Sequence, residues 1–299
     1  MMFIGTASPV AASAGLALLS AAAWGGGDFA GGMGVKATGG STTGALRVVA
    51  AAHAVSLLVL LVVLEARHTA WAWSAPLIWG LVAGVAAGLS LSAFYLALAR
   101  GAMGAAAAVS GLLAAGIPAI VAVWVEGAPT SLRLLGFGVA AAAIWMIAAG
   151  PAPADAKVQS LWLPVGAGVG FGLYFVALRF ANPLGVIEPM ALARMGSLVT
   201  CLVLLAFVRG GRGTTAPQGL WITPRAWAWA LGVAVLDTAG NMLFLAATRA
   251  GRLDVAAVLA SLYPASTILL AAAVLKERPG RQQLWGMAVA VVAVVLITI

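Results

Sequence analysis

Long apolar segments separated by short polar ones run through the whole chain. A helix that crosses a hydrocarbon core of about 30 Å needs roughly 20 apolar residues. Ten segments reach this length when charged residues, prolines and glycine clusters are taken as boundaries. They lie at residues 11–32, 44–64, 76–99, 102–125, 132–149, 161–180, 187–208, 225–248, 253–275 and 284–299. The pattern predicts an all-α membrane protein with ten transmembrane helices.

The composition agrees with a chain that is solvated by lipid. Of its 299 residues, 63% are hydrophobic and 8% are charged, whereas a soluble domain carries about 25% charged residues. The net charge of +8 is spread over many turns, and no helix face carries a basic run that could follow a phosphate backbone. The expected partners are therefore the lipid bilayer and a small-molecule substrate, with no nucleic acid.

One polar turn occurs twice, about 150 residues apart. The first reads Glu126-Gly127-Ala128-Pro129 and the second reads Glu277-Arg278-Pro279, each between two apolar segments. A duplicated polar turn between membrane-length segments is typical of a transporter with internal repeats. We therefore predict two five-helix repeats, at residues 1–150 and 151–299. Because five is an odd number, the repeats insert in opposite orientations.

Other positions match between the two halves. Phe94 corresponds to Phe244, and Arg47 in the second segment corresponds to Arg194 in the seventh. With the duplicated turn and the ten segments, this pattern resembles the paired EamA domains of the drug/metabolite transporter superfamily.

That resemblance implies a monomeric, multi-pass carrier in the bacterial inner membrane that exports small metabolites through a pathway between the halves. It also implies cytoplasmic termini, although the lysines and arginines of the loops lean weakly the other way. The aromatic content and the lack of a strongly charged core are most similar to the YddG type of aromatic amino acid exporter.

Ionisable side chains inside a span normally face protein or a water-filled cavity, because burying them in lipid is costly. The candidates are Asp28, Arg47, His53, Arg194 and Asp237. Asn241 lies one helical turn from Asp237 on the same face. This pair could hold a substrate ammonium or clamp two helices together.

The remaining ionisable candidates have structural alternatives. Asp28 lies late in the first span, where a structural ion pair near the interface competes with substrate contact. His53 could titrate in a cavity or simply bond to a neighbour. Arg47 and Arg194 lie near span starts and could snorkel to the interface. Their presence in both halves favours a shared structural role.

Aromatic residues inside the spans point to the substrate. Trp24 and Tyr174 occupy corresponding positions of the two repeats and would face one another across a central cavity. Tyr95 and Tyr263 also lie within spans. Such walls suit planar, largely apolar substrates, and the alternative for each ring is ordinary packing.

Helix-breaking residues could expose backbone groups at membrane depth. Gly26 is the centre of a glycine triplet in the first span, Pro118 lies in the fourth span and Pro264 in the ninth. Each could instead mark a static kink. The duplicated acids, Glu126 and Glu277, lie at span ends, where a carboxylate pairs with a nearby arginine or caps the following helix. We expect both acids to mark corners of the fold.

The sequence therefore predicts transport by alternating access, with Trp24, Tyr174, His53, Asp237 and Asn241 lining a central cavity. One alternative is a drug/proton antiporter for planar cations. The related four-helix exporters use a glutamate in their first helix, and here only an aspartate could replace it. A remote alternative is an intramembrane enzyme. The sequence has no HExxH, no GxSxG and no metal-ligand spacing, so we expect no catalysis, metal or cofactor.

Overall fold

A computed structural model of the chain describes residues 9–68, 74–99, 103–148, 162–210, 222–276 and 278–299, and the regular structure within these ranges is entirely helical. The elements are α1 (Pro9–Ala37), α2 (Thr42–Ala66), α3 (Ala75–Ala99), α4 (Met103–Glu126), α5 (Ser131–Ala148), α6 (Trp162–Ala181), the 3₁₀ turn η1 (Asn182–Leu184), α7 (Ile187–Gly210), α8 (Pro224–Ala250), α9 (Leu253–Ala260), α10 (Tyr263–Val274) and α11 (Arg281–Thr298). Within the described residues, 9 helical segments are long and apolar enough to cross a membrane, and Ser131–Ile147 forms a shorter apolar helix. The predicted all-α membrane class is confirmed.

Each predicted segment overlaps one helix, except that the ninth overlaps two. The helices α9 and α10 together form one apolar span, Leu253–Val274, which is interrupted at Ser261 and Leu262. Pro264 explains the break, because it has no N–H to continue the hydrogen-bond ladder. By contrast, α1 stays helical through the triplet centred on Gly26, and α4 stays helical through Pro118. Of the three sites where an interruption was considered, only the one at Pro264 interrupts a helix.

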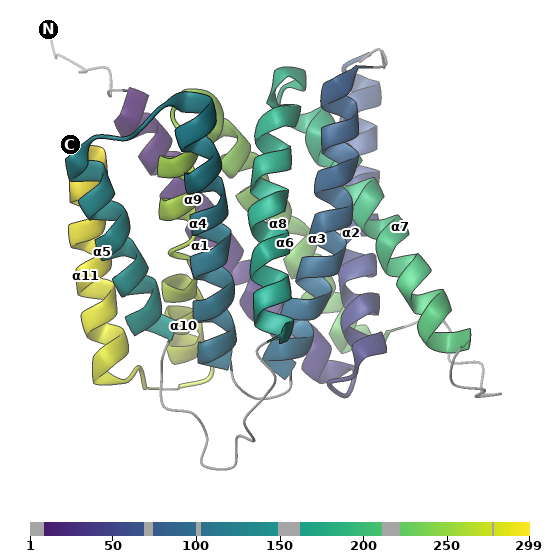
Figure 1. The fold of residues 1–299 in the computed structure, drawn as a ribbon. Helices are drawn as coiled ribbons and strands as arrows, with labels where there is room; N and C mark the ends of the chain where they lie inside the picture. The colour runs from purple at the N-terminus through teal and green to yellow at the C-terminus, as the bar shows by residue number, and fades with distance from the viewer. Residues whose placement is uncertain (1–8, 69–73, 100–102, 149–161, 211–221, 277) are drawn as a thin grey trace, which may run out of the picture.

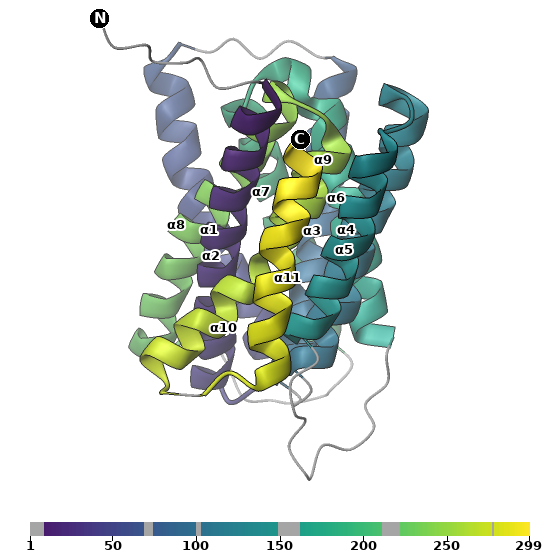
Figure 2. The same cartoon turned by 90° about the vertical axis from the view of Figure 1, so that its left-hand side faces the viewer.

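The helices form an upright bundle in which consecutive spans alternate in direction (Figures 1 and 2). The helix α1 packs on α8 and α10, while α6 packs on α3 and α4; α5 packs on α11, and α2 on α7. In this arrangement α1, α2 and α3 correspond to α6, α7 and α8, α4 corresponds to the pair α9 and α10, and α5 corresponds to α11. Exchanging the corresponding helices maps these contacts onto one another. Moreover, α1 begins at the end of the bundle where α6 finishes (Figure 1). The contacts agree with two halves of opposite orientation, although the proposed boundary at residue 150 lies outside the described residues.

Glycines allow the closest helix approaches. A Cβ atom at Gly84 of α3 would lie 2.5 Å from the carbonyl oxygen of Ala193 and 2.8 Å from Cα of Gly196, both in α7. A Cβ atom at Gly25 of α1 would lie 2.4 Å from Cβ of Ser266 in α10. Small residues are favoured at such crossings because backbone atoms meet directly. The glycine triplet of α1 therefore supports packing against the broken span.

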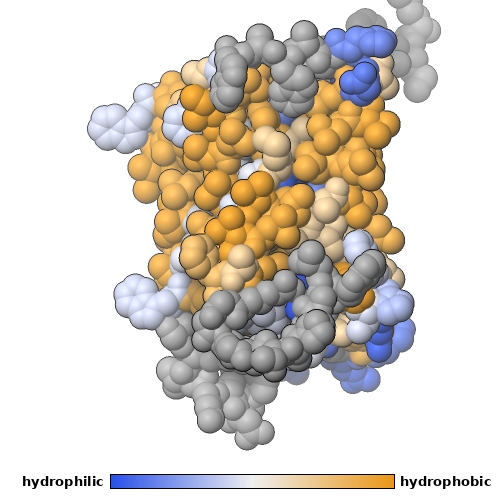
Figure 3. All heavy atoms as spheres, turned by 90° about the vertical axis from the view of Figure 1, so that its right-hand side faces the viewer, coloured by the Kyte–Doolittle hydropathy of each residue, from blue (hydrophilic) through white to orange (hydrophobic). Residues whose placement is uncertain are grey.

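The exterior suits a bilayer. A broad apolar band separates more polar ends on the face shown in Figure 3. Large apolar side chains such as Phe207, Val235 and Val291 are 74%, 68% and 65% exposed. An apolar surface of this extent would associate or aggregate in water, but it matches the hydrocarbon core of a membrane. The chain is a multi-pass membrane protein.

We expect Gly84→Val to destabilise the bundle, because the added side chain would overlap the backbone of α7. Overpacking of this kind costs about 1–3 kcal/mol. The control is Gly138→Val in α5, where a Cβ atom meets nothing within 4 Å. Thermal melting in detergent should show a clear loss for Gly84→Val relative to Gly138→Val. Equal melting temperatures would mean that α3 and α7 do not approach this closely.

Candidate functional site

Three aromatic rings meet where α1, α6 and α8 converge. The Trp24 ring stacks on Phe175 with ring centroids 5.0 Å apart and planes inclined by 9°. Phe244 lies 4.6 Å from Phe175 and 5.6 Å from Trp24, centroid to centroid. Gly240 makes room for this arrangement, because a Cβ atom there would lie 2.5 Å from Cδ1 of Trp24. We call Trp24, Phe175 and Phe244 the aromatic cluster.

A small, partly open cavity with a volume of about 40 Å³ lies beside the aromatic cluster. Its lining comes from α1, α3 and α4 in the first half and from α6, α8 and α10 in the second. The lining residues are Trp24, Asp28, Leu91, Ala114, Phe171, Tyr174, Phe175, Asp237, Asn241 and Tyr263. Mostly apolar walls with a few polar groups are the usual composition of a small-molecule site.

A chain of polar contacts leads from the cavity into the protein. The Tyr174 hydroxyl donates to Oδ1 of Asn241 at 2.6 Å, and Nδ2 of Asn241 donates to Oδ1 of Asp237 at 3.1 Å. The other carboxylate oxygen of Asp237 lies 2.7 Å from Nη2 of Arg194. Arg194 is 1% exposed, so the ion pair is buried. Helices α6, α7 and α8 are thus joined at membrane depth.

The same arginine fixes the state of His53 in α2. Nη1 of Arg194 lies 2.8 Å from Nε2 of His53. Because a guanidinium can only donate, Nε2 accepts this hydrogen bond and carries no proton. The neutral ring therefore carries its proton on Nδ1, which donates to the Ser197 hydroxyl at 2.6 Å. We call Tyr174, Asn241, Asp237, Arg194 and His53 the buried network.

The structure brings together most of the residues that the sequence suggested for the site. The cavity lining includes Trp24, Tyr174, Asp237, Asn241 and Tyr263. The Trp24 ring stacks on Phe175, and Tyr174 contacts Phe175 and donates its hydroxyl to Asn241.

Two of the suggested residues lie elsewhere. His53 lies behind the cavity, beyond Arg194. Tyr95 is fully buried against α1, with its hydroxyl 3.5 Å from the carbonyl oxygen of Gly27. Neither is among the lining residues.

Two residues expected to be structural lie at or beside the cavity. The prediction that Arg194 snorkels to the membrane interface is wrong, because its side chain is buried against Asp237 and His53. For Asp28 the sequence left a structural ion pair and substrate contact open. The structure places it in the cavity lining, and none of the salt bridges among the described residues includes it. Arg47 is half-buried in α2. An intramembrane aspartate needs a positive partner, and this requirement could have singled out Arg194.

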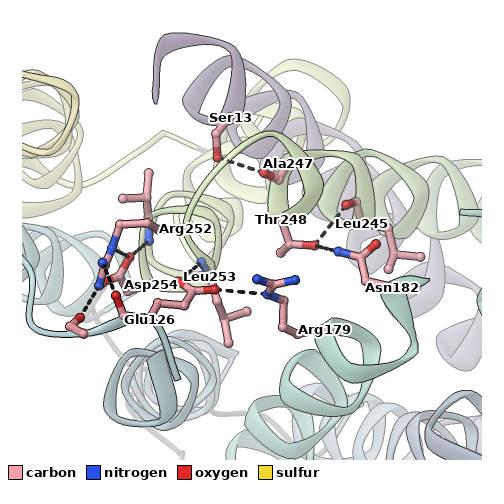
Figure 4. Close-up of polar contacts among 12 residues, drawn as sticks. Ser13, Glu126, Arg179, Asn182, Leu245, Ala247, Thr248, Arg252, Leu253 and Asp254 are labelled. Atoms are coloured by element: carbon pink, nitrogen blue, oxygen red, sulfur yellow. Dashed lines mark hydrogen bonds and ion pairs between the residues drawn. The ribbon is translucent and has the colours of Figure 1, made fainter. Parts of the chain in front are cut away.

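Glu126 joins the two halves at one end of the bundle (Figure 4). Its Oε1 accepts a hydrogen bond from Nε of Arg179 at 3.0 Å, and its Oε2 accepts one from the backbone N–H of Leu253 at 2.9 Å. The carboxylate therefore caps α9 of the second half. The expected pairing with an arginine close in sequence, or capping of the following helix, is wrong for Glu126, because its partners come from α6 and α9. Glu277 lies outside the described residues.

Arg252 extends this contact between the halves (Figure 4). Nη1 donates to the carbonyl oxygen of Glu126 at 3.1 Å, and Nη2 donates to that of Gly127 at 2.7 Å. The guanidinium also pairs with Asp254, with 2.7 Å between Nη2 and Oδ2. The hydrogen bond to Asp254 raises the pKa of Arg252, so this side chain stays charged. We call Glu126, Arg179, Arg252 and Asp254 the terminal polar cluster.

The same end of the bundle carries further polar contacts, which join α1 and η1 to the end of α8 (Figure 4). The Ser13 hydroxyl donates to the carbonyl oxygen of Ala247 at 3.0 Å, and Nδ2 of Asn182 donates to the Thr248 hydroxyl at 2.9 Å. The first contact ties α1 of the first half to α8 of the second, and the second contact holds η1 against α8 within the second half. The part of the chain that the structure describes contains no group of three or more His, Cys, Asp or Glu side chains able to hold a metal ion.

The comparisons with known proteins agree with this architecture. Residues 159–299 match the model of the EamA-like transporter family. This EamA-like segment contains α6 to α11 and so corresponds to the predicted second repeat. None of the curated proteins matches the chain in sequence.

Solved structures support the fold over nearly the whole chain. Fifteen solved chains match. One of them, described as "Crystal structure of protein", superposes with a TM-score of 0.65 over 93% of this chain and 98% of its own, at 18% sequence identity. At this identity the likeness shows the fold alone. The EamA-like match supports a membrane transporter of small molecules, and the substrate class stays a prediction.

We expect single substitutions in the Arg194 and Asp237 pair to destabilise the protein strongly. Removing one partner of a buried pair leaves an uncompensated charge, which costs about 3–5 kcal/mol. Asp237→Asn and Arg194→Met should each lower the melting temperature in detergent. The loss in the double variant should be smaller than the sum of the two single losses. Additive losses would contradict a direct pair, since contacting residues show coupling in double-mutant cycles.

Proposed function

We propose that this protein is a secondary transporter of the bacterial inner membrane that exports small metabolites, with aromatic amino acids as the favoured substrates. The main support for these substrates is the cavity between the halves, because its walls combine aromatic rings with carboxylates and an amide. An aromatic side chain can stack on Trp24 or Phe171, and an amino group can bind to carboxylate oxygens. The EamA-like match of residues 159–299 supports transport of small molecules.

The proposed mechanism is alternating access, in which residues 1–150 and 151–299 rock about the cavity. A carrier of this kind needs contacts between its halves that can open at one end while the other end closes. The terminal polar cluster supplies such contacts, because Glu126 of the first half binds Arg179 and the N-terminus of α9 in the second. The break between α9 and α10 supplies a place where the backbone can bend beside the cavity residue Tyr263.

We expect Trp24→Ala to weaken transport of aromatic substrates more than transport of small aliphatic ones. Aromatic pairs are worth about 0.5–1.5 kcal/mol beyond burial, which corresponds to roughly a 2- to 10-fold loss. The measurement is counterflow of labelled tryptophan and alanine in liposomes. The control is Trp145→Ala in α5, whose ring is 51% exposed on the outer surface. Equal losses for both substrates would assign Trp24 to packing, and no counterflow of any amino acid by the wild type would contradict the proposed function.

We expect Glu126→Gln to open the end of the bundle that the terminal polar cluster closes. The variant loses the charge that binds Arg179 and weakens the cap on α9. The reporter is Ser13→Cys, placed at a buried position of this end, in a Cys201→Ala background that lacks the native thiol. Labelling by a polar maleimide in detergent should become several-fold faster with Glu126→Gln. The matched control is Glu188→Gln in the first turn of α7, and equal labelling rates in the two variants would rule out this role.

A further inference from the structure

Asp28 is a carboxylate in the cavity wall for which the described residues supply no positive partner. It lies one helical turn after Trp24 on the same face of α1 and lines the cavity. In the part of the chain that the structure describes, no hydrogen bond or salt bridge joins its side chain to another residue. The charged residue that acts on it electrostatically is Asp237, an acid that also lines the cavity.

The charges around the cavity leave Asp28 uncompensated. Asp28 and Asp237 are the charged residues among those that line it. Arg194 neutralises Asp237 across 2.7 Å and does not line the cavity. His53 accepts a hydrogen bond from Arg194 and is therefore neutral. Asp28 thus has no cationic partner at membrane depth, where an ionised carboxylate without one is costly. An incoming cation supplies that partner and stabilises the ionised form.

The surroundings of Asp28 suit an organic cation. Trp24, Phe171, Phe175 and Tyr263 line the same cavity, and ring faces attract ammonium groups by their quadrupole. By contrast, no lysine or arginine belongs to this lining. A substrate carboxylate would therefore meet two aspartates and no cationic partner.

We propose that Asp28 binds the ammonium group of the substrate and that the site accepts aromatic monoamines, which are cations without a carboxylate, at least as well as aromatic amino acids. This inference rests on the proposed function and specifies its substrate class. The recognised group is the protonated amine attached to an aromatic ring. The carboxylate of an amino acid is tolerated and is not required.

The test compares three indole compounds in liposomes that contain the purified full-length protein. Tryptamine has an amine alone, tryptophan has an amine and a carboxylate, and indole-3-propionate has a carboxylate alone. The wild type should exchange tryptamine at least as fast as tryptophan and should leave indole-3-propionate at background. Asp28→Asn should slow tryptamine exchange 10-fold or more, whereas Glu65→Gln, at an exposed acid near the end of α2, should leave it unchanged. Asp28→Glu should restore part of the rate.

A second measurement uses the wild type alone and so does not depend on the folding of any variant. A hydrophobic carbodiimide modifies carboxyl groups at membrane depth, and mass spectrometry locates the product. Tryptamine should slow modification of Asp28 several-fold, and indole-3-propionate should not. No protection by tryptamine would overturn the proposal.

The remaining outcomes separate this inference from the proposed function. If the wild type exchanges tryptophan but not tryptamine, the monoamine class is wrong while amino acid transport stands. If Asp28→Asn keeps the wild-type amine rates and loses only its response to a pH gradient, Asp28 carries a proton and the ammonium role is wrong. If neither amino acids nor amines move in the wild type, the proposed function itself fails.

Discussion

The ion pair between Arg194 and Asp237 is the contact on which the centre of the bundle depends. Nη2 of Arg194 and Oδ2 of Asp237 lie 2.7 Å apart at membrane depth, where neither charge could stay buried without the other. Because Arg194 also binds His53, the pair draws α2, α7 and α8 together. The Asp237 carboxylate also accepts a hydrogen bond from Asn241, which in turn accepts one from the Tyr174 hydroxyl. The position of the polar cavity wall therefore follows from a requirement for charge compensation.

A second polar centre lies at the end of the bundle and has a different physical basis. Glu126 and Arg252 satisfy backbone groups as well as charges, since the carboxylate caps α9 and the guanidinium binds two carbonyl oxygens of the α4 to α5 turn. Contacts to backbone at helix ends hold the ends without filling the centre. The protein is thus tied firmly at this end and through the buried network, and the cavity lies beside the network. This arrangement fits a carrier whose halves separate at one end at a time.

The sequence predicted the spans well because membrane thickness fixes their length. It predicted the pairing of charges poorly, since the pairing depends on which helix faces meet. Arg194 and Asp237 are 43 positions apart, and no periodicity marks them as partners. Glu126 was expected to act within its own turn, but inverted packing brings α6 and α9 beside it. The glycine triplet around Gly26 was a candidate break, yet α1 continues, because its glycines accommodate a neighbouring helix.

The contrast between Asp28 and Asp237 shows why residue type alone could not assign the site. Both are aspartates within spans, and both line the cavity. Asp237 has its charge balanced by Arg194 and its other oxygen bound by Asn241, so its geometry is fixed before any substrate arrives. Asp28 has no such partner among the described residues, so its carboxyl group remains available to a cationic ligand. Preorganised groups shape a site and uncompensated ones attract the ligand, because only the latter gain a new electrostatic partner on binding.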